Sequence, residues 1–259
     1  MARMLLASIQ SETLKLKRSA AAWLVIIGAL FIPLMMLIIQ VVGLSKNPEY
    51  QSGPKFWQEL FAKSWESMSI FLLPVGIVLV TSLIGQLEYR NNTWKQIHTT
   101  PQRLSTIFIS KLLVILFLMI YFFLIFNLGI YLAGIVPGLF TGNKLPKEPY
   151  PAISFLKPNL NFLIACLPII AIQYLMSLFF KNFLVSVGLG FACIVGSIFA
   201  LSWSKGYIIP YTYCGGAYLR MLGEKQVFGK VNLELLSLVY FFVVVVTSYF
   251  LYISKKEKG

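Results

Sequence analysis

Aspartate is absent from this chain, histidine occurs once, at His98, and charged residues make up only 12% of its 259 positions. An ordinary soluble domain carries roughly 25% charged residues. Hydrolases, metalloenzymes and NTPases need Asp, His, Cys or Lys groups that converge on one site. The shortage of such groups excludes most catalytic chemistry, and the 58% content of hydrophobic residues indicates a membrane protein that is not an enzyme.

Cysteine is scarce too, because Cys166, Cys193 and Cys214 are the only three and have no spacing typical of metal ligands. The first two lie in strongly apolar runs, so we expect small buried side chains there rather than a metal site. The sequence also has no G-x-x-x-x-G-K-[ST] segment, and therefore no loop that could cradle the phosphates of ATP. We expect no metal, no cofactor and no ATP hydrolysis by this chain alone.

Long apolar stretches, in contrast, are abundant. A helix needs about 20 apolar residues to cross a hydrocarbon core of roughly 30 Å. Stretches of this length, free of Lys, Arg, Glu and His, occupy residues 20–44, 68–87, 112–140, 159–180, 183–203 and 235–253. Only Lys181 and Asn182 separate the fourth from the fifth, and they predict a tight turn because one helix of the combined length could not fit a bilayer. The sequence therefore predicts an all-α polytopic membrane protein with six transmembrane helices in a single domain over 1–259.

The distribution of Lys and Arg predicts the orientation of these helices. If the N-terminus is cytoplasmic, the inner segments hold 12 basic residues in 51 positions and the outer segments hold 10 in 72. Cytoplasmic loops of membrane proteins carry the excess of Lys and Arg, so we expect both termini in the cytoplasm and the chain in the plasma membrane. The basic residues form no stripe, so their expected partners are membrane lipids and not nucleic acid.

The segment 2–18, which precedes the first predicted span, has an amphipathic pattern. Leu5, Ile9 and Leu16 can face lipid on one side of a helix. The side chains that can face water and lipid headgroups include Glu12, Lys15, Lys17 and Arg18. We therefore expect an interfacial helix on the cytoplasmic surface, with a solvated tail as the alternative.

Residues inside the predicted spans indicate packing rather than ion coupling. Proton- and ion-coupled transporters usually keep an ionisable group in their spans, and these stretches contain none. We expect the amide side chains there to form hydrogen bonds between helices. They are Gln40, Gln86, Asn127, Asn161 and Gln173. Small residues of the fifth span favour close helix packing, namely Gly188, Gly190 and Gly196.

The connection between the second and third spans is the most informative polar segment. Thr99 or Thr100 can cap a helix that has Pro101 at its first position. We therefore expect two short interfacial helices joined at the proline. A loop of this kind either docks another protein or is simply well anchored, and the residues alone leave both interpretations open.

Three features together resemble the permease subunits of type 2 ABC exporters. They are the opening 11–19 before the first span, the run Glu88-x-Arg90-x-x-Thr93-Trp94-Lys95 after the second, and Pro101 followed by Lys111. The layout of six spans is similar, more narrowly, to the permeases of lantibiotic-immunity and bacitracin-resistance transporters.

The resemblance implies a half-transporter whose coupling helix, between spans two and three, rests on a separate ABC ATP-binding subunit. It assigns ATPase docking to Glu88, Arg90, Thr93, Trp94, Lys95 and Pro101. In this assignment Trp94 fills an apolar notch on the ATPase and Thr93 caps the coupling helix. A second permease copy or a homologous permease is the other implied partner. The implied cargo is a hydrophobic or amphipathic compound, such as an antimicrobial peptide or a lipid-linked compound.

Other functions compete with this interpretation. An ATP-independent secondary carrier or channel is the main alternative, and the charge-free spans count against it. An intramembrane enzyme would need reactive groups that converge at membrane depth, where only Cys166 and Cys193 lie. Aromatic residues in the predicted outer segments suit either an amphipathic substrate or, as we prefer, an interfacial belt. They are Phe56, Trp57, Phe61, Trp65, Tyr207, Tyr211, Tyr213 and Tyr218.

Overall fold

The computed structural model of the chain describes residues 2–16, 19–46, 51, 53–90, 104–141, 145–180, 182–224, 228–229 and 231–254, with the backbone alone at 2–3, 87–90 and 141. All regular secondary structure in these ranges is helical. Six helical segments are long and apolar enough to cross a bilayer, which confirms the predicted all-α fold with six spans. The segments are Ala20–Lys46, Phe56–Gln86, Leu104–Phe140, Ala152–Phe179, Phe183–Ala200 and Leu233–Ser254.

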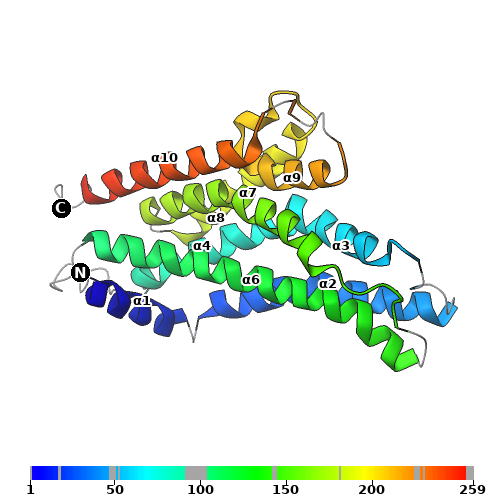
Figure 1. Cartoon of the computed structure of the whole chain (residues 1–259). Coiled ribbons are helices and arrows are strands. Elements are labelled where there is room, and N and C mark those ends of the chain that lie inside the picture. The colour runs from blue at the N-terminus through cyan, green and yellow to red at the C-terminus, as the bar shows by residue number, and fades with distance from the viewer. Residues whose placement is uncertain are drawn as a thin grey trace.

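The helices form an elongated bundle (Figure 1). In chain order they are α1 (Ala2–Leu16), α2 (Ala20–Lys46), α3 (Phe56–Ser67), the π-helical turn η1 (Met68–Leu72), α4 (Leu73–Arg90), α6 (Leu104–Thr141), α7 (Ala152–Phe179), α8 (Phe183–Ala200), the 3-10 turns η2 (Gly206–Ile208) and η3 (Pro210–Thr212), α9 (Tyr213–Met221) and α10 (Leu233–Ser254). α1, the start of α6 and the last turns of α10 lie at one end, which we call the terminal end (Figure 1). α3 and α9 lie toward the other, which we call the distal end (Figure 1).

The second span is longer than predicted, because its helix begins at Phe56 rather than at residue 68. α3 leads through η1 directly into α4. Glu59, Lys63 and Glu66 fall within α3, and a search for charge-free stretches therefore excludes it. What keeps α3 helical and packed is its aromatic face.

The aromatic side chains of α3 are buried in the bundle, so the preferred prediction of an interfacial belt is wrong for them. Trp57, Phe61 and Trp65 recur every four residues, which places them on one helix face. Trp65 stacks on Phe162 of α7 with 3.9 Å between ring centroids, and Phe61 stacks on Phe155 at 4.1 Å. Other residues of the predicted belt that are buried are Phe56, Tyr211, Tyr213 and Tyr218, while Tyr207 is half-buried.

The third and fourth spans also begin earlier than predicted. α6 begins at Leu104 and includes Lys111, which is only 2% exposed, and α7 begins at Ala152 and includes Lys157. The prediction that the spans are free of charge therefore holds for their central turns and is wrong for their end turns.

The tight turn between the fourth and fifth spans is confirmed, because α7 ends at Phe179 and α8 begins at Phe183. Asn182 caps α8, since its Oδ1 accepts a hydrogen bond from the backbone N–H of Leu184 at 3.0 Å.

The glycines of α8 do not all serve close packing. A Cβ on Gly190 would lie 2.6 Å from Oε1 of Gln173, so only glycine allows α7 to approach there. A Cβ on Gly188 or Gly196 would meet no described atom within 4 Å. The packing prediction is confirmed at Gly190, whereas no other described helix of this chain comes close to Gly188 or Gly196.

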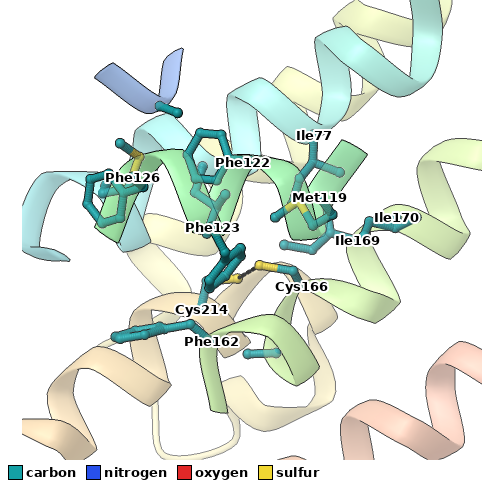
Figure 2. Packing of buried hydrophobic residues seen from close by; sticks show 14 of the residues in the cluster. Ile77, Met119, Phe122, Phe123, Phe126, Phe162, Cys166, Ile169, Ile170 and Cys214 are labelled. Atoms are coloured by element: carbon teal, nitrogen blue, oxygen red, sulfur yellow. Dashed lines mark hydrogen bonds between the residues drawn. The ribbon is translucent and has the colours of Figure 1, made fainter. Parts of the chain in front are cut away.

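The core at the junction of α4, α6, α7 and α9 contains two of the cysteines (Figure 2). Cys166 and Cys214 are fully buried, with their sulfur atoms 3.2 Å apart, and Phe162 lies beside them. Cys193 is half-buried. The prediction of small buried side chains, made for Cys166 and Cys193, is confirmed for Cys166 and is not fulfilled by the half-buried Cys193. No cluster of potential metal ligands occurs in the described part of the chain.

Candidate functional site

The predicted ATPase-docking segment joins α4 to α6. Glu88 and Arg90 lie in the last turn of α4, and the helix α6 follows from Leu104. The remaining predicted docking residues, Thr93, Trp94, Lys95 and Pro101, and the predicted caps Thr99 and Thr100 lie outside the described residues. The structure therefore shows which two helices the segment connects, and that α6 starts at the terminal end.

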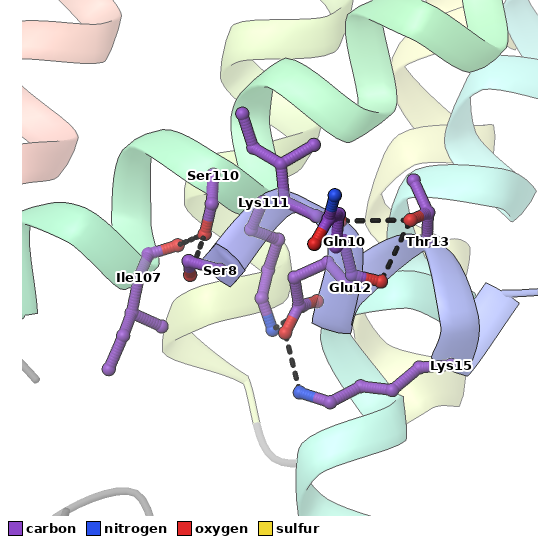
Figure 3. A network of polar contacts seen from close by, with 9 residues as sticks. Ser8, Gln10, Glu12, Thr13, Lys15, Ile107, Ser110 and Lys111 are labelled. Atoms are coloured by element: carbon purple, nitrogen blue, oxygen red, sulfur yellow. Dashed lines mark hydrogen bonds and ion pairs between the residues drawn. The ribbon is translucent and has the colours of Figure 1, made fainter. Parts of the chain in front are cut away.

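α1 packs against the first turns of α6 through a buried polar contact (Figure 3). Glu12 is 7% exposed, and its carboxylate accepts a hydrogen bond from Lys15 and lies 4.0 Å from Nζ of Lys111. One turn earlier on α1, Ser8 donates a hydrogen bond to Oγ of Ser110 at 2.9 Å. Ser8 and Glu12 are four residues apart, so both face α6.

The prediction that Glu12 faces water is therefore wrong. Burying a lone carboxylate costs several kcal/mol, and two lysines compensate the charge here: Lys15 of α1, which donates a hydrogen bond to it, and Lys111 of α6, which lies 4.0 Å away. Leu16 was expected to face lipid but is buried against the bundle. Lys15 is exposed, as predicted. The other predicted headgroup contacts, Lys17 and Arg18, lie outside the described residues.

The first turns of α6 also contact α7 and α10. The backbone oxygen of Phe108 accepts a hydrogen bond from the hydroxyl of Tyr174 at 3.0 Å. The Phe108 ring lies 5.5 Å from the ring of Tyr249 and 5.8 Å from that of Tyr252, both on α10. Residues 108–111 thus contact α1, α7 and α10, so a displacement of α6 at this end would reach three other helices.

A second buried polar network joins α4, α7, α8 and η3. Nε2 of Gln173 donates to Oγ of Ser82 at 2.8 Å, and to the backbone oxygen and Oγ of Ser186 at 2.9 and 3.0 Å. The Tyr211 hydroxyl donates to Oε1 of Gln173 at 3.4 Å. The predicted interhelical role is confirmed for Gln173. Gln40 does not fulfil this interhelical role, because its Oε1 is buried without a hydrogen-bond partner in the described part of the chain.

An apolar cavity of about 260 Å³ lies between α2, α4 and α6. Thr81 of α4 is among the residues that line it, and its hydroxyl is buried. The described residues at this cavity and at the two networks include no set of groups arranged as a nucleophile with its base. The arrangement suits binding and movement rather than bond chemistry.

A comparison with protein families identifies the class of this chain. The family described as ABC-2 family transporter protein matches residues 8–197, which run from α1 into α8 and make up well over half of the chain. This chain belongs to the ABC-2 transporter family. The ABC-2 match includes the Glu12–Lys111 contact and Gln173, while Tyr211 and α10 lie beyond it. Searches of curated proteins and of solved structures gave no match.

Membership gives the ABC-2 chain its general role. It is the membrane-spanning permease of an ABC transporter, a transport subunit rather than a catalyst, and its family implies an ABC ATP-binding subunit as partner. It is a multi-pass protein of the plasma membrane.

Sequence reasoning missed several contact residues of this ABC-2 permease. Serine and threonine occur throughout its apolar spans and form no pattern that singles out the buried ones. Those missed are Ser8, Ser82, Ser110 and Ser186. The buried contact of Lys111 could have been predicted from the sequence, because a lysine this close to a long apolar run needs a partner or a route to water.

Proposed function

We propose that this ABC-2 permease is the transmembrane subunit of an ATP-driven exporter of hydrophobic or amphipathic compounds. Its family supports an ABC transporter, and the apolar cavity supports a hydrophobic cargo. The excess of Lys and Arg in the inner segments supports cytoplasmic termini, so the terminal end faces the ATPase. The resemblance to lantibiotic-immunity and bacitracin-resistance permeases favours an antimicrobial peptide or a lipid-linked compound as cargo.

The contact between α1 and α6 is the observation that carries this proposal. Lys111 meets Glu12 within about two turns of the start of α6, directly after the proposed docking segment. An ATPase that pushes on the segment would move α6 and α1 together, because separating them would break the buried Glu12–Lys111 contact and the buried Ser8–Ser110 hydrogen bond. Phe108 would pass the same displacement to α7 and α10.

We assign docking of the ATP-binding subunit to Glu88, Arg90, Thr93, Trp94, Lys95 and Pro101. Trp94 is the anchor in this proposal, since a buried interfacial aromatic side chain contributes about 2 kcal/mol or more to binding. Glu88 and Arg90 contribute less unless they are desolvated, because exposed ion pairs are worth about 0 to 1 kcal/mol.

We also propose that the permease pairs with a second copy or with a homologous permease. Large apolar side chains on α8 and α10 are uncovered in the single chain, among them Phe199, Phe242 and Phe250. A face of this kind needs lipid or another permease to cover it.

The test is co-purification of the ATP-binding subunit with the permease at equal membrane expression. Trp94→Ala is expected to weaken ATPase binding about thirtyfold or more. Trp23→Ala is the matched control, because Trp23 is 65% exposed near the start of α2 and should leave binding unchanged. A Trp94→Ala permease that keeps its partner and its transport would place docking elsewhere. A wild-type permease that transports without ever binding an ATPase would make the protein an ATP-independent carrier.

A further inference from the structure

Two of the three cysteines lie in direct contact inside the bundle. Sγ of Cys166 on α7 and Sγ of Cys214 on α9 are 3.2 Å apart, and both side chains are fully buried. Figure 2 shows the two sulfur atoms facing each other, with Phe162 close by. Unbonded carbon atoms prefer a separation of about 3.5 to 4.0 Å, and sulfur is the larger atom. The two sulfur atoms are therefore closer than hydrophobic packing alone requires.

Cys214 belongs to a part of the chain that reaches this position from outside the bundle. Residues 201–232 connect α8 to α10 and contain none of the six spans. With both termini in the cytoplasm, this connection crosses to the outer side of the membrane before α9 packs back against α7. Disulfides form in such oxidising compartments and not in the cytoplasm. Both thiols are thus exposed to an oxidising environment before the docking of α9 buries them.

Hydrogen bonds hold the 201–232 connection more firmly to α10 than to α7. On the α10 side, the hydroxyl of Tyr240 donates to the backbone oxygen of Ile208 at 3.1 Å. Toward α7, the hydroxyl of Tyr211 reaches Oε1 of Gln173 only at 3.4 Å, where a hydrogen bond is weak. A covalent bond between the two buried cysteines would fasten the connection to α7, where hydrogen bonding is weaker.

We propose that Cys166 and Cys214 form a disulfide bond in the mature permease. The two S–H bonds break and one S–S bond forms, while the two electrons and two protons pass through a thiol oxidase to a membrane quinone, which becomes the quinol. An S–S bond is about 2.0 Å long, so the sulfur atoms approach by about 1.2 Å from the separation in the structure. The bond joins residues 48 positions apart, and it stabilises the fold by restricting the unfolded chain.

The disulfide goes beyond the proposed function and uses only its orientation. Labelling of a cysteine at position 46 with an impermeant reagent tests that orientation, whereas mass mapping of the native cysteines tests the disulfide. Free thiols in a correctly oriented permease would overturn the disulfide and leave the exporter assignment intact. A disulfide in a permease of reversed orientation would leave the bond established and overturn the orientation.

The experiment maps the cysteines of the full-length permease by mass spectrometry. Intact cells are quenched with acid, so that thiols cannot oxidise during lysis, and free thiols are then alkylated with N-ethylmaleimide in denaturant. We expect a linked Cys166–Cys214 peptide pair in most of the protein, with Cys193 alkylated. Cys166→Ala should free the Cys214 thiol for alkylation. Cys193→Ala is the matched control, because it removes the half-buried third cysteine and should leave the link unchanged.

Thermal unfolding tests whether the bond fastens α9. Permease synthesised in the presence of dithiothreitol has the same sequence but free thiols, and it should unfold about 5 °C or more below the linked protein. Cys166→Ala should unfold at one temperature with or without dithiothreitol. Alkylation of all three cysteines in untreated cells, or a link from Cys214 to Cys193, would overturn the proposed disulfide. Equal unfolding temperatures of linked and reduced wild type would overturn its fastening role.

Discussion

Asn127 of α6 and Asn159 of α7 exchange two hydrogen bonds through their carboxamide groups, with N–O distances of 2.9 and 2.8 Å. Each amide also donates its second hydrogen to the carbonyl oxygen four residues earlier in its own helix. Both donors of each side chain are therefore used inside the protein. In the hydrocarbon core, where water does not compete, such a pair fixes the register between two helices.

Replacing Asn159 with Ala should lower stability, because it breaks both bonds of the pair and leaves the Asn127 carboxamide without its partner. We expect a loss of about 0.6 to 1.7 kcal/mol in detergent, the range for polar contacts between membrane helices. The double variant Asn127→Ala with Asn159→Ala should be little less stable than Asn159→Ala alone, because the single substitution already removes the interaction. Fully additive losses in thermal unfolding would show that the two residues do not interact.

Gly134 is expected to be intolerant of even a methyl group. A Cβ there would lie 2.3 Å from Cζ3 of Trp57, whose indole N–H donates to the backbone oxygen of Glu148 at 2.8 Å and is thereby held in place. Gly134→Ala should cost about 1 to 3 kcal/mol in thermal unfolding, as overpacking does. Gly196→Ala serves as the control, because nothing described lies within 4 Å of that Cβ. Equal behaviour of the two variants would refute the close approach.

The position of α1 predicts a specific cross-link. Cysteines in place of Ser8 and Ser110, whose oxygens are 2.9 Å apart, should form a disulfide on mild oxidation in membranes. Gln10→Cys combined with Ser110→Cys should not, because Gln10 is exposed on another side of α1. Mass mapping distinguishes the two products. Equal cross-linking from both positions would indicate a mobile tail rather than a docked helix.

Cytoplasmic termini predict which positions an impermeant thiol reagent can reach. Cysteine at Lys46, at the end of α2, should react from outside the cell. Cysteines at His98 and Lys256 should react only after the membrane is opened. Labelling of either from outside intact cells would reverse the orientation.

Hydropathy and charge predicted the number of spans but not their true ends. The central parts of the six spans and the turn at Asn182 could be predicted, because the thickness of a bilayer limits the length of a spanning helix. The start of the second span was missed because Glu59 and Lys63 interrupt the apolar run, although Phe61 and Trp65 repeat at helical spacing. A window that averages hydropathy cannot register an aromatic face beside a charged one.

The candidate site depends on contacts between residues far apart in sequence. Glu12 looks like part of the polar face of an amphipathic helix, and its burial depends on packing against α6, where Lys111 lies 4.0 Å away. The Gln173 network similarly requires Ser82 and Ser186 from two other helices. No local pattern encodes such pairings, because each partner belongs to an otherwise ordinary apolar segment.

The Glu12–Lys111 contact leads to the last prediction, which separates a stabilising role from a coupling role. Glu12→Leu should destabilise the permease by up to about 3 kcal/mol, near the low end for breaking a buried pair, since the charges are 4.0 Å apart. Lys111→Met in the same chain should restore most of that loss, because an apolar pair of similar volume often replaces a buried ion pair without cost. Lys15→Met should change the stability little, because Lys15 is exposed and an ion pair with an exposed partner contributes little free energy.

Transport then decides between the two roles. If the contact only holds α1 in place, the restored double variant should stimulate ATP hydrolysis and export cargo like the wild type. If α6 moves α1 through the pairing of charges, the double variant should regain thermal stability and still bind the ATPase but lose export. A double variant that remains as unstable as Glu12→Leu would show that Lys111 is held mainly by other groups, and would remove this contact from the proposed path between ATPase and bundle.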